Sequence, residues 1–225
     1  MNLMPLQNGP SRRQFLATSA SLATLLLAGC APSSGDLSLP GSMDKTLDYK
    51  EIYGPMDSEP HAVKPINLHQ VNKRLYRRRI KYQTDEPVGS IIVDTDRFYL
   101  YLVEEGGTAM RYGVSLGKEG FAWSGRAKVG WKKKWPTWTP PPEMLERKPE
   151  FAEFSKGMPG GSENPLGARA LYIMKDGKDT LYRIHGTPAY WSIGRRASSG
   201  CVRMINQDII DLYDRVPKGA QILVV

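Results

Sequence analysis

The feature that most constrains the fold is a series of short β-rich segments separated by turn residues. Residues 88–93 and 98–103 are rich in β-branched and aromatic side chains, and the four residues between them are typical of a turn. Residues 170–174 and 180–184 flank a second turn, in which Asp176-Gly177 is a strong hairpin signal. Segments joined by such short turns pair antiparallel. The pattern therefore predicts a mainly β domain.

The remaining periodic segments add strands and two helices to this prediction. Residues 109–116 and 221–225 are β-rich. Residues 207–216 have an apolar face at helical spacing, with Asn206 as a candidate N-cap and Pro217 as a stop. Residues 66–82 combine apolar positions with five basic residues between positions 73 and 79, which predicts a short basic helix.

Residues 117–165 are predicted to form a long irregular segment, rich in Pro, Gly and Trp. Such insertions are often functional, so this one could be the wall or lid of a binding site; a structural wrap around the core is an equal alternative. Lys132-Lys133-Lys134 lies between Trp131 and Trp135. We interpret this run as a solvated loop with anchoring tryptophans rather than a nucleic-acid surface.

The first residues are typical of an export signal. Arg12-Arg13 precedes the uncharged stretch 17–29, which ends in Leu27-Ala28-Gly29 before Cys30. The arginine pair resembles a twin-arginine signal, and the last four residues resemble a lipobox, which predicts lipidation of Cys30. An uncleaved anchor is the alternative, but the stretch is shorter than the roughly 20 residues that span a bilayer. Outside the cytoplasm a Cys30–Cys201 disulfide is a further alternative, which lipidation would remove.

The chain is thus divided into a signal (1–29), a flexible tether (30–65), a basic helical lead-in (66–86) and one folded domain (87–225). Removal of Arg12 and Arg13 leaves 29 basic against 23 acidic residues, a net charge of +6. A basic exported protein favours anionic partners such as a membrane surface or a carboxylate-bearing wall polymer. We expect a periplasmic, membrane-anchored monomer that does not bind nucleic acid.

Two motifs carry the candidate chemistry. His185-Gly186-Thr187 is followed after a short connection by a segment that ends in Gly200-Cys201. A thiol becomes a strong nucleophile when it loses its proton, and His185 is a suitable base if the fold brings the two together. The pair predicts an acyl-transfer enzyme with a cysteine nucleophile. A buried core cysteine and a structural histidine are the alternatives.

The neighbours of this pair suggest further roles. Gly200 frees the backbone, so that consecutive amides could stabilise an oxyanion, and Gly186 allows a close backbone approach. Ser199 could orient His185, and Arg203 shares the face of the thiol on an extended backbone, where it could bind a substrate carboxylate. A surface ion pair is the alternative for Arg203. The three histidines, His61, His69 and His185, lack the compact spacing of a zinc site, so we do not expect one.

At these residues the sequence resembles the YkuD-type L,D-transpeptidases of bacterial cell walls. The motifs are His185-Gly186-Thr187 and residues 198–203, Ser-Ser-Gly-Cys-Val-Arg, and the resemblance covers residues 87–225. Ser199 stands where many members have histidine. The resemblance implies an antiparallel β-sandwich or barrel with one or two helices, and it implies a substrate-binding role for Thr187 and Arg203.

The reaction implied by the resemblance joins peptidoglycan stem peptides. Cys201 attacks the bond between meso-diaminopimelate and D-alanine in a tetrapeptide stem, forms a thioester and transfers the acyl group to an amine, which gives a 3→3 cross-link. His185 moves the protons, the resemblance implies no metal or organic cofactor, and carbapenems are expected inhibitors. The acceptor is left open: water would give a carboxypeptidase, and a lipoprotein lysine would give attachment to the wall. A non-catalytic wall-binding lipoprotein is the alternative from another class.

Overall fold

The structure is a computed structural model that describes residues 48–117, 124–198 and 200–225. The predicted export signal (1–29), the lipidation site Cys30 and Ser199 lie outside the described residues, so those interpretations stay predictions.

Eleven strands form two sheets in the described part of the chain. The large sheet has the strand order β1-β4-β3-β2-β11-β6-β7-β8-β10, and β5 pairs with β9 in a small one. Most pairs are antiparallel, whereas β2–β11, β8–β10 and β5–β9 are parallel. The mainly β fold class is confirmed. The strands are β1 (Arg78–Lys81), β2 (Ile91–Asp94), β3 (Tyr99–Glu104), β4 (Thr108–Gly113), β5 (Leu116–Gly117), β6 (Gly125–Lys134), β7 (Arg169–Lys175), β8 (Lys178–Thr187), β9 (Arg196–Ser198), β10 (Val202–Ile205) and β11 (Gln221–Val224).

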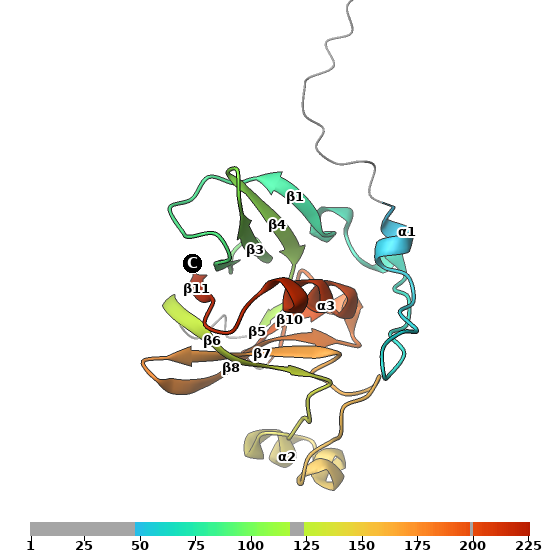
Figure 1. The fold of residues 1–225 in the computed structure, drawn as a ribbon. Coiled ribbons are helices and arrows are strands. Elements are labelled where there is room, and N and C mark those ends of the chain that lie inside the picture. Colours follow the sequence, from blue (N-terminus) through green and yellow to red (C-terminus); the bar gives the residue numbers. More distant parts are fainter. Residues whose placement is uncertain (1–47, 118–123, 199) are drawn as a thin grey trace, which may run out of the picture. The chain divides into compact units, whose positions relative to one another are not determined.

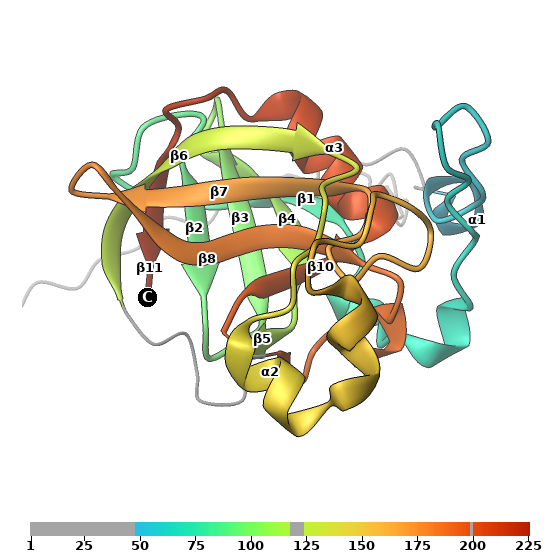
Figure 2. The same cartoon turned by 90° about the horizontal axis from the view of Figure 1, so that it is seen from below.

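The large sheet curls into two layers around the main core. In Figure 2, β6, β7 and β8 cross in front of β2, β3 and β4. Apolar side chains from both layers are buried between them, together with those of helix α3 (Asn206–Arg215). Ser115, just after β4, exchanges two backbone hydrogen bonds of 2.9 Å with Arg203 of β10. The end of the sheet at β10 is therefore joined to its first half, as in a partly closed barrel.

The hairpin between β7 and β8 has the predicted turn. Asp176 and Gly177 both have positive φ, 50° and 76°, which a two-residue type I′ turn requires. Lys175 pairs with Lys178 at its base. The turn sets the pairing next to it, but a register shift between Tyr172 and Met174 separates that pairing from the one that places His185 opposite Ala170.

Helix α3 agrees with the prediction within a residue, but its start differs. Ile209 and Leu212 are fully buried in the main core, and Pro217 follows the helix. Asn206 is the first helical residue rather than the N-cap, which is Ile205. The Asn206 side chain accepts a hydrogen bond from Ala168 N at 3.0 Å, so the capping prediction is wrong because a tertiary partner takes this side chain.

The basic helix predicted for residues 66–82 is also wrong. The segment forms two short 3₁₀ turns, η1 (Leu68–Gln70) and η2 (Lys73–Leu75), and then strand β1. Asn67 and Asn72 each accept a hydrogen bond from a backbone N–H two residues later, which starts a turn and competes with a helix.

Residues from 48 onward, part of the predicted tether, pack on the domain. Figure 1 shows α1 (Tyr49–Ile52) and the segment after it beside the strands. They cover the outer face of β2, β3 and β4 and form a second apolar cluster. Its buried members are Tyr53, Val71, Leu75, Tyr76, Ile92, Tyr99, Tyr101, Val103, Ala109, Ile193 and Ile205.

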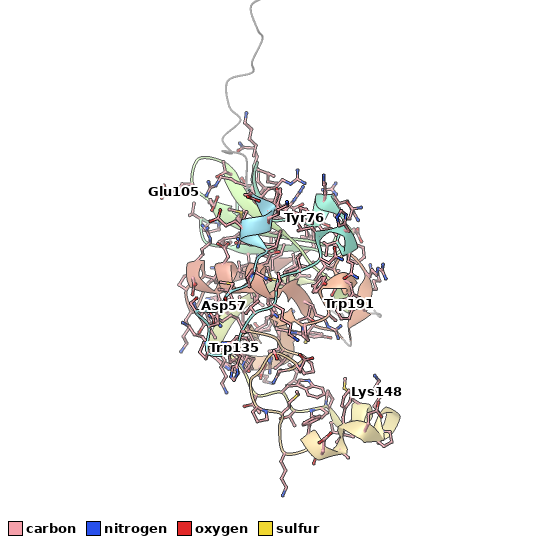
Figure 3. All side chains as sticks on the ribbon, turned by 90° about the vertical axis from the view of Figure 1, so that its right-hand side faces the viewer. Asp57, Tyr76, Glu105, Trp135, Lys148 and Trp191 are labelled. Atoms are coloured by element: carbon pink, nitrogen blue, oxygen red, sulfur yellow. The ribbon has the colours of Figure 1, made fainter. Side chains whose placement is uncertain are left out.

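The segment 117–165 is more regular than predicted in its described part. Lys132-Lys133-Lys134 belongs to β6, so the loop expected there is wrong: pairing with β7 fixes these lysines in a strand. After β6 come α2 (Pro142–Arg147) and η3 (Pro149–Phe154), and in Figure 3 the part near Lys148 projects away from the strands. In the described ranges no helix is long and apolar enough to cross a bilayer.

Candidate active site

The parallel pair β8–β10 brings the two predicted motifs together. In its register His185 lies opposite Arg203, and Ile184 lies opposite Val202. Ile184 and Val202 are fully buried in the main core. Because side chains alternate along strands, His185 and Arg203 share the other face of this pair.

Cys201 directly precedes β10, so continuation of the same register sets it level with Arg183 of β8. A backbone hydrogen bond from Arg183 to the thiol agrees with this position. The thiol is thus offset by two residues along the strands from His185, and diagonal neighbours of this kind are about 7–8 Å apart between backbones. The alternation of side chains puts the thiol on the face of His185 and Arg203.

The backbone before Cys201 needs glycine. Gly200 has φ +133°, and a Cβ there would lie 2.9 Å from Cε1 of Tyr182. The connection from β8 to this glycine is held against the first half of the sheet: Gly194 N donates to Val114 O at 2.9 Å, and β9 pairs with β5. A short, pinned connection therefore fixes the approach of the thiol to β8.

The ring of His185 is oriented by its own chain neighbour. Nδ1 lies 2.6 Å from the carbonyl oxygen of Gly186. Because a carbonyl only accepts, Nδ1 carries the hydrogen and Nε2 is left as the basic nitrogen. The predicted orienting residue, Ser199, lies outside the described residues, so its contribution stays a prediction.

Burial decides the protonation states of the pair. It lowers the pKa of His185 to about 4; the carbonyls of Gly186 and Leu166 oppose this, and the charges of Arg203 and Arg183 add to it. Burial raises the pKa of the Cys201 thiol, although the backbone and charge of Arg183 and the charge of Arg203 act against it. At neutral pH the resting pair is therefore a thiol and a neutral imidazole, not a thiolate–imidazolium pair.

Arg203 is a half-buried cation beside this pair. Burial lowers the pKa of its guanidinium, and the neighbouring Cys201 acts in the opposite direction. The sequence left a surface ion pair as the alternative role for Arg203. Among the described residues no carboxylate lies within ion-pair distance of its guanidinium. A guanidinium in this position is available to an anionic group.

The side chain of Asn206 packs directly against the strand that carries His185. A Cβ on Gly186 would lie 2.2 Å from Oδ1 of Asn206, and one on Gly167 would lie 2.3 Å from the same oxygen. That oxygen is held by the N–H of Ala168, which is fully buried. The close approach of α3 to β8 therefore requires glycine at position 186.

Thr187 is buried, and its hydroxyl accepts a hydrogen bond from Ala189 N at 3.1 Å, which turns the chain after β8. Its predicted substrate contact stays a prediction. Sequence reasoning missed Arg183, which lies two residues before His185 on the same strand face; that spacing was the available signal. In the described ranges no group of three acidic, His or Cys side chains could hold a metal ion.

The comparisons with known proteins assign the family of the part of the chain that contains the two motifs. The family model of the L,D-transpeptidase catalytic domain, YkuD, matches residues 89–224. The chain belongs to this family. The matched range begins before β2 and ends at the last residue of β11, so it contains β8, β10 and both motifs.

The chain is also similar to individual curated proteins and to solved structures. The probable L,D-transpeptidase YbiS of Escherichia coli (strain K12) is 36% identical over 138 residues, 59% of this chain and 43% of that protein. The probable L,D-transpeptidase ErfK/SrfK of the same strain is 40% identical over 98 residues, 42% of this chain and 29% of that protein. The chain thus spans less than half the length of these relatives. A solved chain from Brucella melitensis, described as a probable carnitine operon oxidoreductase, is 44% identical and covers 71% of this chain and 99% of its own, with a TM-score of 0.48.

Proposed function

We propose that this chain is a peptidoglycan L,D-transpeptidase with Cys201 as nucleophile and His185 as its base. The observation that carries the proposal is the β8–β10 register, in which the thiol, the imidazole and the Arg203 guanidinium share one face. The donor is a tetrapeptide stem whose third residue is meso-diaminopimelate. The family assignment supports the reaction class, and the residue roles are proposed from the geometry.

In the first step the Cys201 sulfur attacks the carbonyl carbon of the bond to D-alanine. Nε2 of His185 takes the thiol proton as the C–S bond forms, because the resting thiol keeps its proton. The amides around Gly200 stabilise the oxyanion, and Arg203 binds a stem carboxylate. The C–N bond then breaks, the imidazolium returns the proton to the leaving amine, and a thioester remains.

In the second step an amine of another stem attacks the thioester. His185 takes a proton from that amine, the C–S bond breaks, and the thiolate of Cys201 regains the proton. Water in place of the amine would give a tripeptide by hydrolysis, and a lipoprotein lysine would give attachment to the wall.

The test is to incubate the purified chain with disaccharide-tetrapeptide and to measure product masses. A cross-linked dimer that has lost D-alanine supports transpeptidation, and tripeptide alone supports hydrolysis. Cys201→Ala should abolish both products and any carbapenem adduct. His185→Gln should slow acylation about 10²–10⁴-fold, whereas the exposed control His69→Gln should not change it. Turnover by Cys201→Ala would refute the nucleophile.

We also propose that the protein is exported and anchored to a membrane through a lipid on Cys30. The support is the sequence of residues 1–30 alone. Fractionation of cells should find the chain in membranes, and Cys30→Ala should release it to the soluble periplasmic fraction. Continued membrane retention of the Cys30→Ala chain would contradict the anchor.

A further inference from the structure

Two arginines oppose each other across the strands β1 and β4. Arg78 and Arg111 are register partners in this antiparallel pair. Like charges directly opposite each other destabilise a strand pair, so this arrangement needs a compensating interaction. Both side chains are half-buried, which limits their screening by water.

The contacts of the two guanidiniums fix their positions without neutralising them. Nη2 of Arg78 donates to the carbonyl of Lys73 at 3.1 Å, and Nη2 of Arg111 donates to the carbonyl of Arg74 at 2.9 Å. Arg111 also lies over the ring of Tyr99, 4.3 Å from its centroid. Burial lowers the pKa of Arg111, and the charge of Arg78 lowers it further.

An anionic partner is missing from the described part of the protein. Of the ion pairs between described residues, none involves Arg78 or Arg111. The Nε atoms of both side chains are buried and have no hydrogen-bond partner among these residues. An arginine offers five N–H donors; in each of these two, Nε is buried and Nη2 donates to a carbonyl, so the other Nη donors remain for a ligand. Buried donors without partners are uncommon in folded proteins.

We propose that Arg78 and Arg111 form a binding site for a phosphate-type oxyanion. Two guanidinium forks match the several acceptor oxygens of a phosphate, and one anion between them would convert a repulsive pair into a bridged one. The exposed Lys73 and Arg74 next to the site add positive charge. The phosphate comes either from the headgroup of an anionic lipid or from free phosphate. This site is separate from the proposed transpeptidase function and does not depend on it.

The test compares Arg78→Gln and Arg111→Gln with Arg97→Gln, in the full chain with Cys30→Ala so that no lipid at that position contributes. Arg97 is a matched control, because its side chain is 75% exposed and pairs with Asp94. Inorganic phosphate should raise the melting temperature of the parent chain and of the Arg97 variant. Each test variant should bind phosphate at least about tenfold more weakly by calorimetry, because one charged fork is lost.

Melting temperatures in phosphate-free chloride buffer give a second readout, in which the expected effect has the opposite sign. Without a bridging anion, Arg78→Gln or Arg111→Gln removes one of two opposed charges and should leave the melting temperature unchanged or raise it. If Arg111→Gln folds poorly, Arg111→Lys takes its place in the test. This variant keeps the charge but removes the guanidinium fork, so it should also lose phosphate binding. An equal phosphate response in Arg111→Gln and Arg97→Gln would overturn the proposal.

The source of the phosphate is decided with vesicles. Sedimentation with phosphatidylglycerol–phosphatidylcholine vesicles should show weaker binding of Arg111→Gln than of Arg97→Gln if the ligand is a lipid headgroup. Equal vesicle binding by the two variants, with arginine-dependent binding of inorganic phosphate, identifies free phosphate as the ligand.

Discussion

The contact between Gly186 and Asn206 makes a quantitative prediction about what holds β8 in place. Asn206→Ala removes the acceptor for the N–H of Ala168, which is fully buried. An unpaired buried donor costs about 1–3 kcal/mol. Gly186→Ala introduces a Cβ 2.2 Å from the Asn206 oxygen, and overpacking of this kind costs about 1–3 kcal/mol. Each single variant should therefore lower the free energy of unfolding by a few kcal/mol.

The double variant should be more stable than the sum of the two losses predicts. Without the Asn206 side chain, the nearest atoms to a Cβ at position 186 are Ala168 N and Ile209 Cγ2, both at 3.1 Å, which need only a small adjustment. We expect a coupling of about 1–2 kcal/mol, within the range for residues in contact.

Urea unfolding of the four proteins at pH 7 measures this coupling, with the slope checked for constancy. Asn206→Asp is the matched control, because it keeps an acceptor oxygen and should lose less stability than Asn206→Ala. Losses that add within about 0.5 kcal/mol would refute the reasoning, because they would mean that the Asn206 side chain is not what excludes a Cβ from position 186.

Two further predictions follow from burial. The pKa of His185 falls from 6.5 to about 4 on folding, so the unfolded chain binds more protons than the folded chain between these pH values. The free energy of unfolding should therefore drop by about 3 kcal/mol as the pH falls through this range. In urea unfolding, His185→Gln should lose that part of the pH dependence. A pH dependence equal to that of the parent chain would contradict the buried neutral imidazole. Glu59 pairs with the buried Arg169 at 2.5 Å, so Glu59→Gln should lower the stability of the folded chain by about 3 kcal/mol. Loss of the exposed Lys64–Glu163 pair should change that stability by less than about 1 kcal/mol. Equal shifts in melting temperature on loss of either pair would contradict the expectation that burial makes the Glu59–Arg169 pair the more important of the two.

Local pattern predicted the hairpin and the helix well. Asp176-Gly177 gave the turn, because a type I′ turn depends on two residues and their allowed φ angles. Residues 207–216 gave α3 because its buried side chains recur at helical spacing. Residues 66–82 were predicted wrongly because Asn67 and Asn72 use their side chains on the local backbone, a choice that apolar spacing does not reveal.

The candidate site shows the same contrast between what local sequence predicts and what tertiary contacts decide. The sequence by itself determined which chemistry to propose, since a thiol, an imidazole and the glycines around them are fixed by residue type, and the family model matches the same region. The tertiary structure alone decided that β8 and β10 pair in parallel, that the carbonyl of Gly186 contacts the ring of His185, and that Arg78 opposes Arg111. These are contacts between segments, and their geometry depends on strand register and burial, which no local stretch of sequence contains.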